Sequence, residues 1–191
     1  MRLEVLKKLF GIVMIMSERI NSTTYLDIDG VIFPLSTRAK GFEVPSDAVV
    51  IDKNEFYYPD IVRRLGSLST RLILSSSRGV ATLVDKYYKE LLEELNVAGV
   101  LSINAFEPSN PNYKFDAITG HRDGRNKAFH RRSFDPTPIG TKAVWIDDDA
   151  WNISEEKKTF LDNTNFKVIV PDGKIGLTHA HLDSIESFIH T

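Results

Sequence analysis

Short apolar runs alternate with longer amphipathic segments along most of the chain. Five runs, each bounded by turn residues, have the apolar, β-branched or aromatic composition of buried strands. They cover residues 23–28, 71–74, 97–103, 143–146 and 166–170. Between them, apolar residues recur at three- and four-residue spacing, which is typical of one face of a helix. This spacing predicts helices at residues 59–67, 83–95, 154–163 and 178–189.

Strands that alternate with helices in this way predict an α/β fold with a mostly parallel sheet. We expect a Rossmann-like three-layer sandwich, in which helices cover both faces of a five-stranded sheet. Residues 33–58 hold turns and two short extended pieces, and these would form a flap. Prolines and asparagines make residues 104–120 loop-like, and the basic stretch 121–132 is expected to become helical.

The first 21 residues are harder to interpret. Their apolar residues fall at helical spacing, which favours an amphipathic helix or extension packed on the domain or on a partner. The apolar run 9–16 resembles a weak signal sequence, but no small-residue cleavage site follows it and it is too short to span a membrane. A start at Met14 or Met16 stays open. Residues 22–191 are expected to form one domain.

Composition and charge narrow the classes of function. With 191 residues and 42% hydrophobic content, the chain can bury a core of ordinary size. A formal net charge of -2 excludes a nucleic-acid binder that works through its overall field, although not a local basic patch. The sequence contains no cysteine, which excludes disulfides, thiol catalysis and zinc–thiolate sites and fits a cytoplasmic protein. We expect no association with a membrane.

Three of the expected strands end in polar clusters. The first ends in Asp27 and Asp29, followed by Gly30; the second ends in three serines at 75–77, and the fourth in three aspartates at 147–149. The carboxyl ends of parallel strands meet at one edge of the sheet, where such folds bind their ligands. We therefore expect the three clusters to converge, although the first one alone would fit a solvated turn equally well.

Converging residues of these types fit phosphoryl chemistry with a metal ion. The carboxylates of Asp27, Asp29 and Asp147 would repel one another, and a divalent cation relieves that repulsion. Mg²⁺ is favoured because it prefers carboxylate oxygens, water and phosphate as ligands. Lys127 is the candidate positive partner for a phosphate, and Ser75 is the candidate hydroxyl donor. One aspartate could attack phosphorus while another transfers the proton of the leaving group.

These motifs, in this order along the chain, resemble those of the haloacid dehalogenase (HAD) superfamily. The residues that carry the resemblance are Asp27-Ile28-Asp29-Gly30-Val31, Ser75, Lys127 and Asp147-Asp148. The chain also looks like the small HAD domains of RNA-repair and polynucleotide phosphatases, through residues 145–149 and 176–178, and the resemblance extends over residues 23–189. Val31 departs from the threonine that more often follows the glycine, which is a common variant compatible with phosphatase chemistry.

The resemblance implies a role for each residue. Asp27 would be the nucleophile, and Asp29 would be the general acid and base. Mg²⁺ would be held by Asp27, by the backbone carbonyl of Asp29 and by Asp147, and Asp148 would contribute directly or through water. The other expected site residues are Ser75 and Lys127 in the catalytic set, and Gly30, Ser76, Arg78 and Arg125 as substrate contacts.

The spacing between the motifs leaves room for a minimal cap or none. Residues 104–126 would supply at most a small lid, and the flap 33–58 would stand beside the site. An open site of this kind suits a bulky substrate, such as a nucleic-acid end or a phosphoprotein, and does not exclude a nucleotide. The basic cluster 121–132 could contact further phosphates or could be a solvated helix face, and Arg78 could likewise touch substrate or lie on the surface.

The expected function is Mg²⁺-dependent hydrolysis of a phosphate monoester through an aspartyl-phosphate intermediate. A non-catalytic binding protein with the HAD fold and a phosphotransferase are the alternatives. The sequence leaves the substrate and the oligomeric state open.

Overall fold

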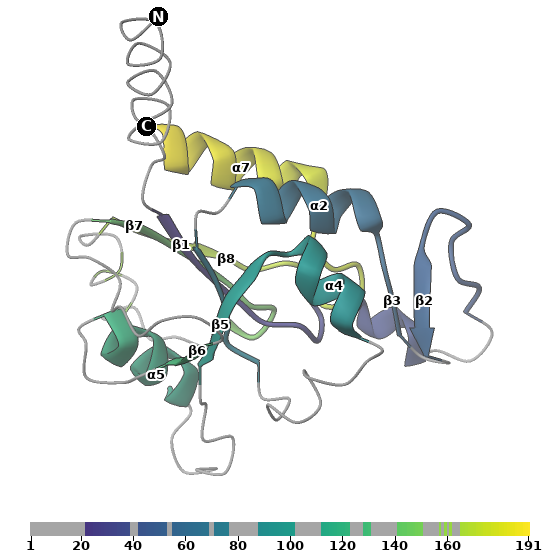
Figure 1. Cartoon of the computed structure of the whole chain (residues 1–191), viewed down its shortest axis with the longest axis horizontal. Helices are drawn as coiled ribbons and strands as arrows, with labels where there is room; N and C mark the ends of the chain where they lie inside the picture. Colours follow the sequence, from purple (N-terminus) through teal and green to yellow (C-terminus); the bar gives the residue numbers. More distant parts are fainter. Residues whose placement is uncertain are drawn as a thin grey trace, which may run out of the picture.

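The chain is represented by a computed structural model (Figure 1). It describes residues 22–38, 42–52, 55–68, 71–76, 88–101, 112–122, 128–130, 141–150, 157, 159, 161 and 165–191. The expectations for residues 1–21, Arg78, Arg125 and Lys127 therefore lie outside the described residues.

The predicted alternation of strands and helices is confirmed where the structure describes the chain; most of the helix expected at residues 154–163 and residues 83–87 of the helix expected at 83–95 lie outside the described residues. The elements follow one another as β1 (Ser22–Leu26), η1 (Leu35–Arg38), β2 (Val49–Asp52), β3 (Glu55–Tyr57), α2 (Pro59–Leu68), β4 (Arg71–Leu74), α4 (Lys89–Glu94), β5 (Val97–Leu101), α5 (Tyr113–Arg122), β6 (Ala128–His130), β7 (Lys142–Ile146), β8 (Phe166–Ile169) and α7 (His179–His190). Each of the five predicted strands is present at its expected place.

The main sheet has the strand order β6-β5-β4-β1-β7-β8. Strands β5, β4, β1, β7 and β8 are parallel, and β6 pairs antiparallel with β5 at the edge. From β1 the chain first extends the sheet on one side through β4 and β5, and it then returns to place β7 and β8 on the other side of β1. The strand order therefore reverses between β1 and β7, which is where open α/β sheets bind their ligands.

Adjacent residues along β1, β4 and β7 belong to cores on opposite faces of the sheet. One core contains Leu26, Leu74 and Ile146; the other contains Tyr25, Ile73 and Trp145. Because side chains alternate across a strand, each of these three strands contributes to both cores. Helices α2, α4 and α7 cover the first face, and α5 covers the second, so the fold is the predicted three-layer α/β sandwich (Figure 1).

The two extended pieces expected in the flap form a separate antiparallel sheet, β2 with β3. The side chains of Phe56 and Tyr57 are buried and anchor this hairpin to the domain. The hydroxyl of Tyr88 donates a hydrogen bond of 2.6 Å to Oε2 of Glu55, and its ring lies 5.9 Å from that of Phe33. The hairpin is thus joined to the start of α4 and to the turn after β1.

Two expectations between β5 and β7 were wrong. Residues 104–120 were expected to be a loop, but residues 113–122 form α5. The stretch 121–132 was expected to be helical, but α5 ends at Arg122 and residues 128–130 form β6. A three-residue strand carries too little periodicity to be recognised locally, and β6 exists because β5 offers it a pairing edge.

Helix α7 begins after Thr178, as predicted. The Thr178 amide donates to Nδ1 of His181 over 3.1 Å. Arg64 of α2 donates to the carboxylates of Asp183 and Glu186 of α7, over 2.6 and 2.8 Å. None of the described helices is long and apolar enough to cross a membrane.

Candidate active site

The site begins where the parallel strands end. Asp27, Ser75 and Asp147 are the first residues after β1, β4 and β7. Their backbone amides each donate to the last carbonyl of a neighbouring strand, over 2.9, 2.7 and 3.2 Å respectively. These bonds continue the sheet ladder by one residue, so the backbone positions of all three residues are set by the sheet. The predicted convergence of the strand ends is confirmed for these residues.

A tight turn follows Asp27. The carbonyl of Ile28 accepts hydrogen bonds from the amides of residues 32 and 33, over 2.9 and 3.0 Å, and the Gly30 amide donates to Phe33 over 2.9 Å. Asp29, the expected general acid and base, occupies a half-buried position in this turn. Gly30 has a φ of +70°, a conformation that favours glycine.

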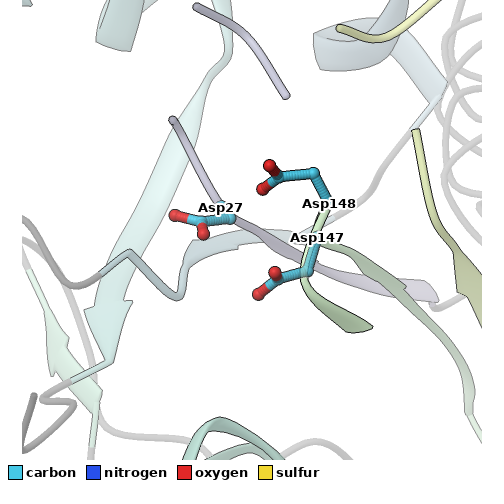
Figure 2. Close-up of side chains that lie close together, drawn as sticks. All are labelled: Asp27, Asp147 and Asp148. Atoms are coloured by element: carbon cyan, nitrogen blue, oxygen red, sulfur yellow. The ribbon is translucent and has the colours of Figure 1, made fainter. Parts of the chain in front are cut away.

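Three carboxylates gather at the strand ends. Oxygens of Asp27, Asp147 and Asp148 lie within 4.8 Å of one another. Figure 2 shows the three side chains projecting towards the same side, from the end of β1 and from the segment after β7. Asp27 and Asp147 are buried, and Asp148 is half-buried. Like charges held this close require a positive partner.

Lys114, in the first turn of α5, is such a partner. Its Nζ contacts Oδ2 of Asp27 and lies 2.8 Å from Oδ2 of Asp147, and its side chain is only 11% exposed. Lys127, which was expected to be the positive partner, lies outside the described residues. Lys114 was missed because its segment was interpreted as a loop. Asn112, a favoured residue before a helix, and the helical spacing of Phe115 and Ile118 could have revealed it.

The charges of the cluster shift the pKa values of its members. Burial alone would lower the pKa of Lys114, but the nearby charges of Asp27 and then Asp147 outweigh it, so the pKa is raised and the ammonium is stabilised. Burial, followed by repulsion from Asp27, raises the pKa of Asp147. Burial, followed by repulsion from Asp149, Asp147 and Asp27, raises the pKa of Asp148 to about 6.

Hydrogen bonds fix the orientation of the two buried carboxylates. Oδ1 of Asp27 accepts from the Ile28 amide over 2.7 Å. In Asp147, Oδ1 accepts from the Asp149 amide over 2.9 Å, and Oδ2 accepts from Nε1 of Trp145 over 3.3 Å. In Asp147 the hydrogen bond from the Asp149 amide favours the ionised form and so opposes part of the rise in pKa that burial causes.

Two glycines leave the space that the Asp148 carboxylate occupies. A Cβ added to Gly30 would lie 2.1 Å from Oδ2 of Asp148, and one added to Gly173 would lie 2.4 Å from the same atom. The turn around Gly173 is joined to the segment after β1, because the Leu35 amide donates to the Gly173 carbonyl over 2.8 Å. Gly30, which was expected to contact substrate, therefore also makes room for the Asp148 carboxylate.

Ser75 supplies a polar group that needs a partner. Its side chain is fully buried, and among the described residues its Oγ has no hydrogen-bond partner. A buried hydroxyl without a partner carries a free-energy penalty, which a ligand oxygen would remove. Ser76, an expected substrate contact, is also buried. Of the other expected contacts, Arg78 and Arg125 lie outside the described residues.

The donor set of the cluster fits a hard divalent cation. Carboxylate oxygens are the ligands that Mg²⁺ prefers, and Asp27, Asp147 and Asp148 offer them at close range. Among the described residues of the cluster, the three carboxylates carry three negative charges when ionised, against one positive charge on Lys114. A divalent ion would balance the remaining two charges. The residues present therefore fit the Mg²⁺ site that the sequence predicts.

No protein-family model matches the chain, and a comparison with curated proteins likewise returns no match. The described residues of the site offer three clustered carboxylates, the buried ammonium of Lys114 and the buried hydroxyl of Ser75, at the point where the strand order reverses.

Proposed function

We propose that this protein is a Mg²⁺-dependent phosphatase of the HAD type that hydrolyses a phosphate monoester through an aspartyl-phosphate. The observation that carries the proposal is the contact of Lys114 with both Asp27 and Asp147, next to Asp148. A carboxylate nucleophile, a fixed cation and a set of metal-ligand oxygens are the groups that phosphoryl transfer to a carboxylate requires.

In the first half-reaction, a carboxylate oxygen of Asp27 forms a bond to phosphorus while the ester P–O bond breaks. Asp29 donates a proton to the departing alkoxide. In the second half-reaction Asp29 accepts a proton from water as the water oxygen attacks phosphorus, which releases inorganic phosphate and restores the Asp27 carboxylate. Asp29 thus acts first as the general acid and then as the general base.

The surrounding residues hold charge in place during both steps. Lys114 neutralises the negative charge that accumulates when a phosphate approaches Asp27. The Ser75 hydroxyl donates to a phosphate oxygen and so gains a partner, which none of the described residues supplies. Mg²⁺ bound by Asp27, Asp147 and Asp148 would neutralise further phosphate charge. We propose a nucleotide or a nucleic-acid end as the substrate, in the cytoplasm.

The test compares the wild-type protein with Asp27→Asn, using p-nitrophenyl phosphate with MgCl₂ or EDTA. We expect Mg²⁺-dependent turnover by the wild type and a loss of about 10³-fold or more in the variant, because the amide cannot act as the nucleophile. Asp47→Asn, which removes an exposed carboxylate before β2, is the matched control and should retain activity. Mg²⁺-dependent hydrolysis by Asp27→Asn at the wild-type rate would refute the assignment.

The same assay extends to substrates. Free nucleotides, oligonucleotides with 3′- or 5′-phosphate ends and sugar phosphates should be compared by kcat/KM, and we expect the nucleotide or oligonucleotide class to give the highest value. Absence of turnover across the whole panel would instead favour a phosphate-binding protein. Transfer of the phosphoryl group to an acceptor other than water would favour a phosphotransferase.

A further inference from the structure

Helix α5 brings Lys114 to the site from the face of the sheet opposite to α2 and α7 (Figure 1). Its residues Phe115 and Ile118 are buried in the core that also contains Tyr25 and Ile73. Lys114 lies in the first turn of the helix, where the helix itself supplies few backbone hydrogen bonds; the Asp116 amide donates to the Asn112 carbonyl over 2.9 Å. The direction in which Lys114 points therefore depends on what holds this first turn.

Lys157 contacts the first turn at two adjacent residues. Its Nζ lies 3.6 Å from Oδ1 of Asp116 and 4.6 Å from the centroid of the Phe115 ring. The Lys157 side chain is 24% exposed, and that of Asp116 is 53% exposed. An ion pair this exposed contributes little alone, but the partly buried contact with the aromatic ring adds to it.

We propose that Lys157 is a positioning residue for Lys114. Successive residues of an α-helix point about 100° apart around its axis. A side chain that holds both Phe115 and Asp116 therefore fixes the rotation of the turn and hence the direction of Lys114. With this rotation fixed, the Lys114 ammonium contacts Asp27 and Asp147 together.

The connection after β7 then has two functions in the site. At its start it supplies Asp147, one of the two carboxylates that Lys114 contacts. Further along it supplies Lys157, which holds the helix that carries Lys114. The catalytic consequence rests on the proposed function, whereas the placement of Lys114 does not.

The first experiment measures placement without any turnover. An amine-specific acylating reagent is applied to the folded protein, and peptide mass spectrometry follows labelling at Lys114. We expect slow labelling in the wild type, because the ammonium is buried and paired, and labelling at least about fivefold faster in Lys157→Met. Lys157→Arg should remain slow, since a guanidinium keeps both the charge and the stacking contact. Equal labelling rates in the wild type and Lys157→Met would overturn the proposal.

The second experiment is a double-mutant cycle on turnover. We expect Lys157→Met to lower kcat about five- to tenfold with a smaller change in KM, and Lys157→Arg to restore it. In the Lys114→Met background, Lys157→Met should have no further effect, because the group that it positions is gone. Equal effects of Lys157→Met in the presence and absence of Lys114 would contradict the proposed role.

Arg64→Met provides the control for general loss of stability. It removes the ion pairs that Arg64 of α2 makes with Asp183 and Glu186 of α7, on the other face of the sheet, and changes no residue of α5. We expect its Lys114 labelling to match the wild type. If labelling supports the placement but no phosphoester is turned over, the proposed function fails and the inference on Lys157 stands. If turnover is present and Lys157→Met leaves it unchanged, the inference fails and the proposed function stands.

Discussion

Replacing Lys114 with methionine removes the positive charge of the site while it keeps a long unbranched side chain. In the wild type, Lys114 Nζ contacts the carboxylates of Asp27 and Asp147, whose side chains are only 6% and 0% exposed. Without it, these neighbouring carboxylates face each other in a buried position. We therefore expect the variant to lose both stability and turnover.

The size of the stability loss can be worked out in two ways. Removing one partner of a buried ion pair typically costs about 3–5 kcal/mol. Alternatively, the site can relieve the repulsion by taking up a proton. At pH 7 this costs about 4 kcal/mol for a carboxyl with an ordinary pKa of 3.8, at 1.36 kcal/mol for each pH unit. The two values agree, so we expect the free energy of unfolding to fall by about 4 kcal/mol at pH 7.

The same reasoning predicts the sign of the pH dependence. A carboxyl whose pKa is raised in the folded state binds its proton more tightly there than in the unfolded chain, so the variant gains stability relative to the wild type as the pH falls. At pH 5 the cost of protonation falls to about 1.6 kcal/mol. Mg²⁺ should restore more stability to the variant than to the wild type, because it binds the folded state and meets a site with one more negative charge.

The assay is urea denaturation at pH 7 and pH 5, in EDTA and in MgCl₂, followed by turnover of p-nitrophenyl phosphate. Turnover should fall by about 10²–10³-fold, as for loss of one preorganised charge in a site. Lys89→Met is the control: this lysine is 66% exposed and pairs with Glu93 over 3.9 Å, so its loss should cost less than about 0.5 kcal/mol. A Lys114→Met protein as stable as the wild type in EDTA at pH 7 would refute the reasoning.

Two further predictions concern the turn after β1 and the start of α7. Gly30→Ala should lower the free energy of unfolding, measured by urea denaturation, by about 1–3 kcal/mol, because φ is +70° and the new Cβ would meet Asp148. In an Asp148→Ala background, only the part of that loss caused by the backbone conformation should remain. Burial lowers the pKa of His181 from its ordinary value of 6.5, and the Thr178 amide donates to the Nδ1 atom of its neutral ring. The neutral ring therefore contributes stability above pH 6.5, and this contribution is lost as the pH falls through the lower pKa of the folded state. His181→Gln should remove this part of the pH dependence of the urea midpoint, whereas His190→Gln, at the exposed end of α7, should retain it.

Much of the fold can be predicted from local patterns. The strands of the parallel sheet were recognisable because each is a short apolar run that ends in turn residues. Parallel strands place their carboxyl ends at one edge, so Asp27, Ser75 and Asp147 could be expected together from sequence positions alone. The hairpin β2–β3 and the start of α7 after Thr178 were likewise recognisable from residues that are close together in the sequence.

The region between β5 and β7 could not be predicted in this way. Prolines and asparagines before α5 resemble loop composition, and the three residues of β6 form a strand because β5 is there to pair with them. The close approach of Gly30 and Gly173 to Asp148 could not be predicted from local sequence either, because it brings together segments far apart in the sequence.

The sequence by itself determined the acidic half of the site, because each aspartate follows a strand that its own residues specify. Among the described residues, the tertiary structure decided that Lys114 meets those aspartates. Lys114 reaches Asp27 across 87 residues of sequence, and only the packing of α5 against the sheet brings the two together. Periodicity depends on neighbours along the chain, whereas charge compensation depends on distance in space; the basic half of the site therefore emerged only with the folded structure.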